Sequence, residues 1–218
     1  MKNTNFTNTR SNISSFSDFL RPRTLDELTL PSETIKRLQA MIDSQNVMNM
    51  IFYGSPGTGK TTCANIIVNS AEFDFIFINA SLQTRVNVVK EMIASFTTAM
   101  SLYQSKKVVL LDEAEFLNES AQASLRGVIE QSSSYCRFIL TTNKLSKIHP
   151  AIQSRCMPIC FDLPLPKMPE AIAKVTSTIN NRFSEINEVI DDKSLNEIVR
   201  LSYPDYRTIA NKIEFEML

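Results

Sequence analysis

The sequence predicts an α/β protein with a parallel five-stranded sheet, followed by a small unit of three helices. Five short apolar runs alternate with helix-compatible segments over the first three quarters of the chain. Strands that alternate with helices form a parallel sheet covered by helices on both faces. After residue 163 the pattern is helical, with no convincing strand. A chain of 218 residues is long enough for one medium and one small domain.

The predicted strands cover residues 47–53, 73–79, 107–111, 137–142 and 157–161, and the helices between them cover 60–69, 86–103 and 118–130. Three prolines between residues 164 and 169 then end the sheet region and make a stiff connector. Helical patterns follow near residues 170–183, 194–201 and 206–216. The expected division is a flexible, Asn-, Thr- and Ser-rich arm over residues 1–15, a sheet domain over 16–162 and a helical domain over 163–218.

Three of the four glycines lie within six residues of one another, directly after the first predicted strand. Glycine lets a chain turn tightly and aim several backbone N–H groups at a phosphate, which a Cβ atom would obstruct. At a strand-to-helix junction, this pattern favours a phosphate-binding loop over an ordinary turn. Lys60 is expected to reach the β- and γ-phosphates of ATP, and the Thr61 hydroxyl to ligate Mg²⁺. The residues expected to bind nucleotide here are Gly54, Ser55, Pro56, Gly57, Thr58, Gly59, Lys60, Thr61 and Thr62.

Two adjacent carboxylates, Asp112 and Glu113, follow the apolar run 108–111. Asp112 at the strand end is expected to hold Mg²⁺ through its water shell, and Glu113 to orient and deprotonate the attacking water. Asn143 directly follows the next predicted strand, where such a sheet places the γ-phosphate, and is expected to hold the attacking water. Taken alone, Thr-Thr-Asn is an ordinary strand-to-turn sequence, so the surrounding pattern decides this assignment.

The charge composition indicates no partner, because 23 Lys and Arg residues balance 23 Asp and Glu residues. The four cysteines have no paired C-x-x-C spacing, which favours reduced thiols and argues against a zinc site. No stretch approaches the apolar length of a membrane span, and the N-terminus has no hydrophobic signal core. These features predict a cytoplasmic protein with no membrane partner, in the host cytoplasm if the chain is viral.

Several segments carry a more specific pattern. They are residues 20–28, 112–115, 121–130, 142–148, 150–156 and 203–207, and the fifth ends in the triplet Ser154-Arg155-Cys156. Together they closely resemble the clamp-loader branch of the AAA+ ATPases. The downstream part most resembles the small ATPase subunit of bacteriophage clamp loaders, which are relatives of the replication factor C small subunits. The resemblance covers nearly everything from Phe16 to the end.

The resemblance implies a P-loop AAA+ domain with a helical lid, and an ATPase that works with neighbouring subunits. Arg155 matches the arginine finger, which reaches the ATP of the adjacent protomer. Arg207 matches the second sensor, an arginine on the third lid helix that contacts the γ-phosphate. Arg21 and Pro22 match the segment that lies against the adenine. The expected catalytic residues are Lys60, Glu113, Asn143 and Arg155.

The resemblance also implies three kinds of partner: other clamp-loader subunits, a sliding clamp and primer-template DNA. Relatives usually place a basic DNA contact five positions after the residue matching Asn79, where this chain has Thr84. Either Arg85 serves after a local shift, or the contact is lost. In the first case Arg85 could also hold Glu113 inactive until DNA draws it away. Gly127 stands where relatives often have another arginine, which removes a possible phosphate contact.

Relatives have a third, all-helical collar domain after the lid, whereas this sequence ends at Leu218, about where the lid ends. The chain is therefore expected to be a fragment, a short form completed by another polypeptide, or a subunit that assembles through ATP and AAA+ contacts only. Two other functions remain open at this point. One is a DNA motor of the branch-migration helicase type, against which the Ser154-Arg155-Cys156 triplet argues. The other is an adaptor that binds ATP and the loader without turnover.

Overall fold

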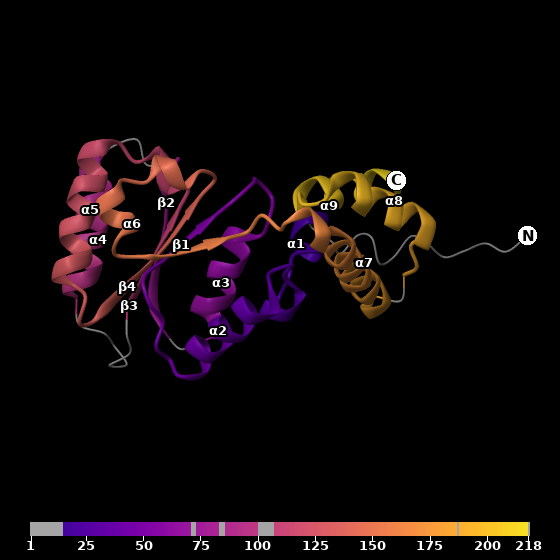
Figure 1. Ribbon diagram of the computed structural model, residues 1–218, viewed down its shortest axis with the longest axis horizontal. Coiled ribbons are helices and arrows are strands. Elements are labelled where there is room, and N and C mark those ends of the chain that lie inside the picture. Colours follow the sequence, from indigo (N-terminus) through magenta and orange to yellow (C-terminus); the bar gives the residue numbers. More distant parts are fainter. Residues whose placement is uncertain (1–14, 71–72, 83–85, 100–106, 187, 218) are drawn as a thin grey trace, which may run out of the picture. The chain divides into compact units, whose positions relative to one another are not determined.

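Five parallel strands form the sheet of the computed structural model, which describes residues 15–70, 73–82, 86–99, 107–186 and 188–217. The strand order is β2-β3-β4-β1-β5 (Figure 1). The register pairs Ile51 of β1 with Leu140 of β4 and with Pro158 of β5. The strands are β1 (Met50–Tyr53), β2 (Asp74–Asn79), β3 (Lys107–Asp112), β4 (Cys136–Thr142) and β5 (Met157–Cys160). The predicted α/β class is thereby confirmed.

Helices cover both faces of this sheet, with α4 (Val86–Thr98) and α5 (Glu119–Gln131) on one face and α3 (Lys60–Ser70) on the other (Figure 1). Residues Val108 to Leu111 of β3 are fully buried, as expected for a central strand covered on both sides. Alternate residues of β3 and β4 pack with Ile93 of α4 and Leu125 of α5 in one hydrophobic core. The strands are therefore fixed in register, and so are the loops that follow them.

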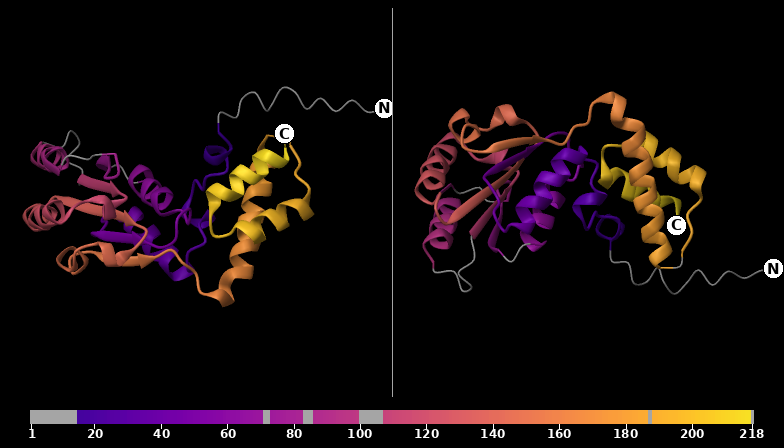
Figure 2. Two further views of the ribbon diagram at one scale, coloured as in Figure 1. Left: turned by 90° about the horizontal axis from the view of Figure 1, so that it is seen from above. Right: turned by 60° about the horizontal axis from the view of Figure 1, so that its bottom comes forward.

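Two compact units divide the chain: residues 30–162, which contain the sheet, and a helical unit of residues 163–218 together with the chain up to Thr29. The helical unit contains α1 (Phe16–Phe19), α7 (Met168–Glu185), α8 (Asp192–Ser202) and α9 (Tyr206–Glu216), of which α7 to α9 run from orange to yellow in Figure 2. Asp191 caps α8 and Asp205 caps α9, each by accepting backbone N–H bonds.

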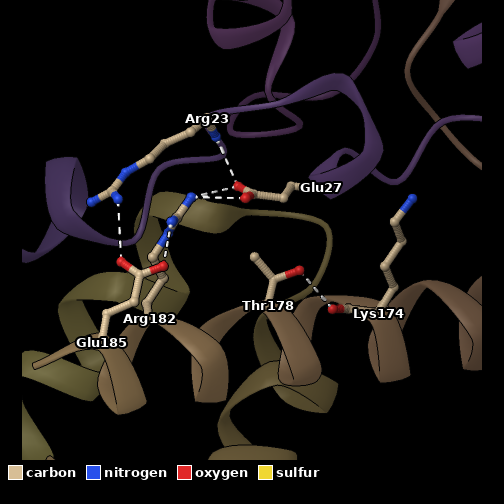
Figure 3. Close-up of polar contacts among 6 residues, drawn as sticks. All are labelled: Arg23, Glu27, Lys174, Thr178, Arg182 and Glu185. Atoms are coloured by element: carbon tan, nitrogen blue, oxygen red, sulfur yellow. Dashed lines mark hydrogen bonds and ion pairs between the residues drawn. The ribbon is translucent and has the colours of Figure 1, made fainter. Parts of the chain in front are cut away.

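The segment Phe16 to Thr29 packs with the helical unit, although we expected it in the sheet domain. Phe16 and Leu20 lie in the same core as Phe183 of α7. Arg182, 5% exposed, donates to both carboxylate oxygens of Glu27 at 2.9 and 2.7 Å (Figure 3). This contact spans 155 residues of sequence, so no local pattern indicated it.

Glu27 also accepts the backbone N–H of Arg23, and the Arg23 guanidinium donates to Glu185, which is paired with Arg182 as well (Figure 3). Lys174 donates to the carbonyl of Leu28 at 2.8 Å. These contacts join the segment that precedes the sheet to α7 along most of its length.

Other differences from the predicted elements are local. The sequence analysis did not anticipate α2 (Ser32–Asp43) or the short α6 (Pro150–Gln153), and β1 begins three residues later than predicted. Asn49, just before β1, accepts the backbone N–H of Met157 at 2.8 Å, and its side chain bonds to the backbone of Phe138 and Arg155. The predicted arm over residues 1–15 lies outside the described residues except for Ser15, which caps α1.

All four cysteines are free, and Cys63, Cys136 and Cys156 are buried. Burial raises the pKa of Cys136 to about 11 and that of Cys156 to about 12, so both thiols are protonated at neutral pH.

In the part of the chain that the structure describes, no helix is both long enough and apolar enough to cross a bilayer.

Replacing Arg182 by Ala leaves the Glu27 carboxylate without its buried partner. We expect the helical unit to lose about 3–5 kcal/mol of unfolding free energy. Urea denaturation followed by circular dichroism measures this loss. Arg37→Ala is the matched control, because its pair with Glu33 is exposed on both sides and should cost less than about 1 kcal/mol. Equal stability of the two variants would contradict this account of the helical unit.

Candidate nucleotide-binding site

The candidate site lies at the carboxyl ends of the sheet strands. The glycine-rich loop follows β1, Asp112 ends β3, and Asn143 follows β4. Parallel strands present all their carboxyl ends at one edge, which is where ligands bind in open α/β sheets. Residues that are 51 and 83 positions apart in the sequence, Thr61 with Asp112 and Lys60 with Asn143, thus meet because of the sheet topology.

The loop from Gly54 to Gly59 has the backbone that its glycines allow. All three glycines have positive φ: +144° at Gly54, +74° at Gly57 and +91° at Gly59. Residues other than glycine rarely adopt these φ angles. A Cβ atom at Gly54 would also lie 3.1 Å from the backbone nitrogen of Asp162. The loop then passes directly into α3, which begins at Lys60, so its N–H groups are at a helix N-terminus.

Lys60 is 8% exposed, and its ammonium group joins the loop to β4. The Nζ atom donates to the carbonyls of Gly54 at 2.9 Å and Ser55 at 2.8 Å, and to Oδ1 of Asn143 at 3.0 Å. A buried ammonium group needs such acceptors. Lys60, which is expected to reach the γ-phosphate, is therefore in direct contact with Asn143, which is expected to hold the attacking water.

Asp112 accepts two hydroxyl hydrogen bonds on one carboxylate oxygen. Thr61 donates to its Oδ1 at 2.6 Å and Thr141 at 2.7 Å. The Thr141 hydroxyl in turn accepts the backbone N–H of Glu113 at 3.0 Å. Asp112 is 7% exposed, and its carboxylate is held by the hydroxyl groups of Thr61 in α3 and Thr141 in β4. A hydroxyl and a carboxylate held together are oxygen donors of the kind that Mg²⁺ prefers, so these residues fit that ion.

Glu113 has a left-handed backbone, with φ of 56° and ψ of 43°. This conformation is uncommon for a residue other than glycine and is found often at functional sites. The hydrogen bond from its N–H group to Thr141 fixes the turn directly after the strand. The chain therefore changes direction between the two carboxylates, which gives adjacent residues the different environments that the predicted roles require.

Three residues at this edge were missed by the sequence analysis: Thr141, Glu115 and Asp162. Glu115 accepts the backbone N–H of Asn143 at 2.9 Å, and Asp162 accepts that of Ser55 at 2.8 Å. The carboxylate spacing in residues 112–115 was a usable signal for Glu115. Nothing in the local sequence distinguishes Thr141 from Thr142, because only the side-chain direction differs between them.

Arg155 is placed apart from this hydrogen-bonded cluster, directly after α6. Its guanidinium pairs with Glu130 of α5 and donates to the carbonyl of Ala151 at 2.7 Å. The hydrogen bond from Arg155 lowers the pKa of the Glu130 carboxyl group. The arginine is 27% exposed along its side chain, so part of it is accessible to solvent.

The remaining predicted residues lie in the helical unit, in α3 of the sheet unit, or outside the described residues. Arg21, Pro22 and Arg207 belong to the helical unit, where Arg21 pairs with Asp18 at 2.8 Å and Arg207 is exposed in the first turn of α9. Thr62, in the first turn of α3, is half-buried. Arg85 lies outside the described residues.

Comparison with protein families matches residues 50–163 to the family described as "ATPase family associated with various cellular activities (AAA)". The chain belongs to the AAA family of ATPases. The matched range begins at β1 and ends just after Asp162, so it contains the glycine-rich loop, the acidic strand end and Asn143. An AAA ATPase binds nucleotide, and the resemblance to this family drawn from the sequence is confirmed.

Curated relatives are replication factor C subunits. The small subunit of Archaeoglobus fulgidus is 36% identical over 204 residues, which is 89% of this chain and 61% of that protein. The probable subunit 5 of Dictyostelium discoideum is 32% identical, over 89% of this chain and 56% of that protein. The chain thus spans somewhat over half the length of the relatives it matches. These replication factor C relatives agree with the resemblance to clamp loaders that the sequence motifs indicated.

Solved structures show the fold. The Holliday junction branch migration motor RuvB of Thermotoga maritima has a TM-score of 0.67 at 22% identity, covering 90% of this chain and 64% of that one. The ORC1 protein of Aeropyrum pernix in complex with DNA has a TM-score of 0.68 at 17% identity, covering 92% of this chain and 63% of that one. At these identities the likeness establishes shared architecture only.

Thr141→Val should weaken binding of ATP in the presence of Mg²⁺ by about tenfold, because it removes one hydrogen bond to a charged group and leaves the Glu113 N–H unpaired. Affinity for ATP in excess EDTA should change little. Fluorescent-nucleotide titration under both conditions measures the difference. Thr142→Val is the control, since within the described part of the chain the Thr142 hydroxyl bonds only to the backbone of Lys144. Equal effects of the two variants on ATP affinity would show that the hydrogen bond from Thr141 to Asp112 makes no specific contribution to binding.

Proposed function

We propose that this chain is an ATPase subunit of a sliding-clamp loader, which uses ATP binding and hydrolysis to place a clamp on primer-template DNA. The observation that carries the proposal is the hydrogen-bonded cluster of Lys60, Thr61, Asp112 and Asn143 in a chain related to replication factor C small subunits. The proposed substrate is ATP. The proposed metal ion is Mg²⁺, which would neutralise charge on the phosphates when bound to Thr61 and Asp112.

Each residue of the cluster has a role that follows from its contacts. Lys60 exchanges the Gly54 and Ser55 carbonyls for phosphate oxygens, because an ammonium group binds anionic oxygens more strongly than neutral ones. Asn143 stays beside Lys60 and orients the attacking water. Glu113 removes a proton from that water. The left-handed turn at Glu113 separates this carboxylate from the metal-binding one.

Arg155 serves the ATP of a neighbouring subunit in this proposal. Its separation from the Lys60 cluster supports this role, since the cluster has its own cation and the arginine is bonded elsewhere in the chain. To reach another subunit, the guanidinium must leave Glu130 and take a phosphate oxygen instead. Both partners are anions, so the arginine remains paired before and after the exchange.

The helical unit acts as the lid. We propose that Arg21 and Pro22 contact the adenine and that Arg207 contacts the γ-phosphate, as their positions in the family motifs imply. Arg85 is a proposed contact to the DNA backbone. The proposed partners are other loader subunits, the clamp and primer-template DNA, and the proposed location is the cytoplasm. The likeness to RuvB at 22% identity concerns architecture alone and adds no support for a branch-migration motor.

ATPase activity measured with and without primed DNA and clamp tests this proposal. Stimulation by DNA and clamp together, with co-purified partner subunits present, is the expected result. Stimulation by DNA alone accompanied by strand displacement would support a motor instead. Binding of ATP without turnover under every condition would support an adaptor.

Glu113→Gln and Arg155→Ala should both bind ATP with nearly the wild-type affinity and lose at least about 10²-fold in turnover by the assembly. The two defects differ in where they act. Mixing the variants should restore activity only at interfaces that combine an intact Glu113 with an intact Arg155 from the neighbour. Steady-state turnover of mixed assemblies measures this complementation, and its absence would contradict hydrolysis shared between subunits.

A further inference from the structure

Asp162 is the last residue of the sheet unit, and its side chain contacts the glycine-rich loop. Oδ1 accepts the backbone N–H of Ser55 at 2.8 Å. A Cβ atom built on Gly54 would lie 3.2 Å from both Cγ and Oδ1 of Asp162, which is tighter than ordinary van der Waals contact. The carboxyl group is therefore packed against the first glycine of the loop while it bonds to the next residue.

Ser55, which Asp162 binds, also takes part in the hydrogen bonds that hold the rest of the loop. The Ser55 carbonyl accepts both the Lys60 ammonium at 2.8 Å and the Thr58 hydroxyl at 2.9 Å. The Gly54 carbonyl accepts Lys60 as well, at 2.9 Å. The Ser55 N–H group lies in the same peptide plane as the Gly54 carbonyl, so the bond to Asp162 fixes the orientation of one of the two carbonyls to which Lys60 is bonded.

The backbone around Asp162 is itself anchored to β1. Phe161 donates its N–H to the carbonyl of Tyr53 at 2.7 Å, which extends the pairing of β1 with β5 by one step. The pKa of Tyr53 is raised, mainly by burial and to a smaller extent by Cys160 and the negative charge of Asp162. Asp162 therefore directly follows a residue whose backbone is hydrogen-bonded to the end of β1.

The chain leaves the sheet unit directly after Asp162, and Leu163 belongs to the helical unit. Prolines at 164, 166 and 169 restrict the backbone of the segment that follows. Asp162 thus bonds to the loop through its side chain and directly precedes a segment with few backbone conformations.

We infer that Asp162 is a positioning residue for nucleotide binding that holds the first half of the glycine-rich loop and links the state of that loop to the connector beginning at Leu163. The inference rests on the proposed binding of ATP at this loop. Asp162 does not touch the reacting atoms. It acts through Ser55, whose N–H group is held by a charge-assisted hydrogen bond.

Three variants separate this role from a general structural one. Asp162→Ala removes the acceptor, Asp162→Asn retains an acceptor oxygen and removes the charge, and Asp43→Ala removes an exposed carboxylate at the end of α2 in the same unit. Titration with a fluorescent ATP analogue should give a dissociation constant about tenfold or more higher for Asp162→Ala, the factor that corresponds to losing one hydrogen bond to a charged group. Asp162→Asn should change it by about threefold or less, and Asp43→Ala not at all.

The link to the connector is tested by amide hydrogen exchange of peptides that cover residues 163–169. In the wild-type chain, saturation with a non-hydrolysable ATP analogue should change the exchange rate of this segment. In Asp162→Ala at a nucleotide concentration that also saturates it, the change should be lost, and Asp162→Asn should restore most of it. Thermal melts of all variants should agree with the wild type within a few degrees, and Asp162→Asn supplies the comparison if Asp162→Ala does not fold.

The outcomes are distinct. A wild-type chain that binds no ATP would overturn the proposed function together with this inference. A wild-type chain that binds ATP, with Asp162→Ala equal to it in affinity and in exchange of the connector, would overturn the inference alone. The inference alone would also be overturned if the ATP analogue left the amide exchange rate of residues 163–169 unchanged in the wild-type chain. Equal losses in Asp162→Ala and Asp162→Asn would also overturn it, because the retained acceptor would then have no effect.

Discussion

The parallel direction of all five strands is the constraint on which the candidate site depends. It brings the loop after β1 and the residues that end β3 and β4 to one edge of the sheet, although Lys60 and Asn143 are 83 residues apart in sequence. The direction itself follows from composition, because central strands that are apolar along their whole length must be covered on both faces by the intervening helices. The burial of β3 is thus the first requirement for the position of Asp112.

Within that edge, the hydrogen bonds form two groups with different chemistry. Lys60 and Asn143 present a cation and an amide, which suit phosphate and water. Thr61 and Asp112 present hydroxyl and carboxylate oxygens, which suit a divalent cation. Thr141 joins the second group to the turn at Glu113. Both groups are therefore held in place by hydrogen bonds within the chain, Lys60 to Asn143 and Thr61 to Asp112.

The sequence was sufficient for the parts of this arrangement that depend on local pattern. The glycine-rich loop, the acidic strand end and the strand-to-helix alternation are short-range features, and the structure has them where they were predicted. The roles of their side chains remain predictions. Contacts such as Asp162 with Ser55, 107 residues apart, depend on which side chains the strand register turns toward one another. The placement of residues up to Thr29 in the helical unit was missed for the same reason, since it depends on buried partners far along the chain, such as Arg182.

The central claim is that the cluster around Lys60 and Asp112 binds one ATP with Mg²⁺. Isothermal titration calorimetry of ATP into the purified chain, with Mg²⁺ in excess, tests it most directly. The account predicts saturable binding of one nucleotide per chain that is lost in Lys60→Ala, while Lys36→Ala, at an exposed position on α2, binds as the wild type does. No binding to a folded wild-type chain, or binding that Lys60→Ala leaves unchanged, would contradict it.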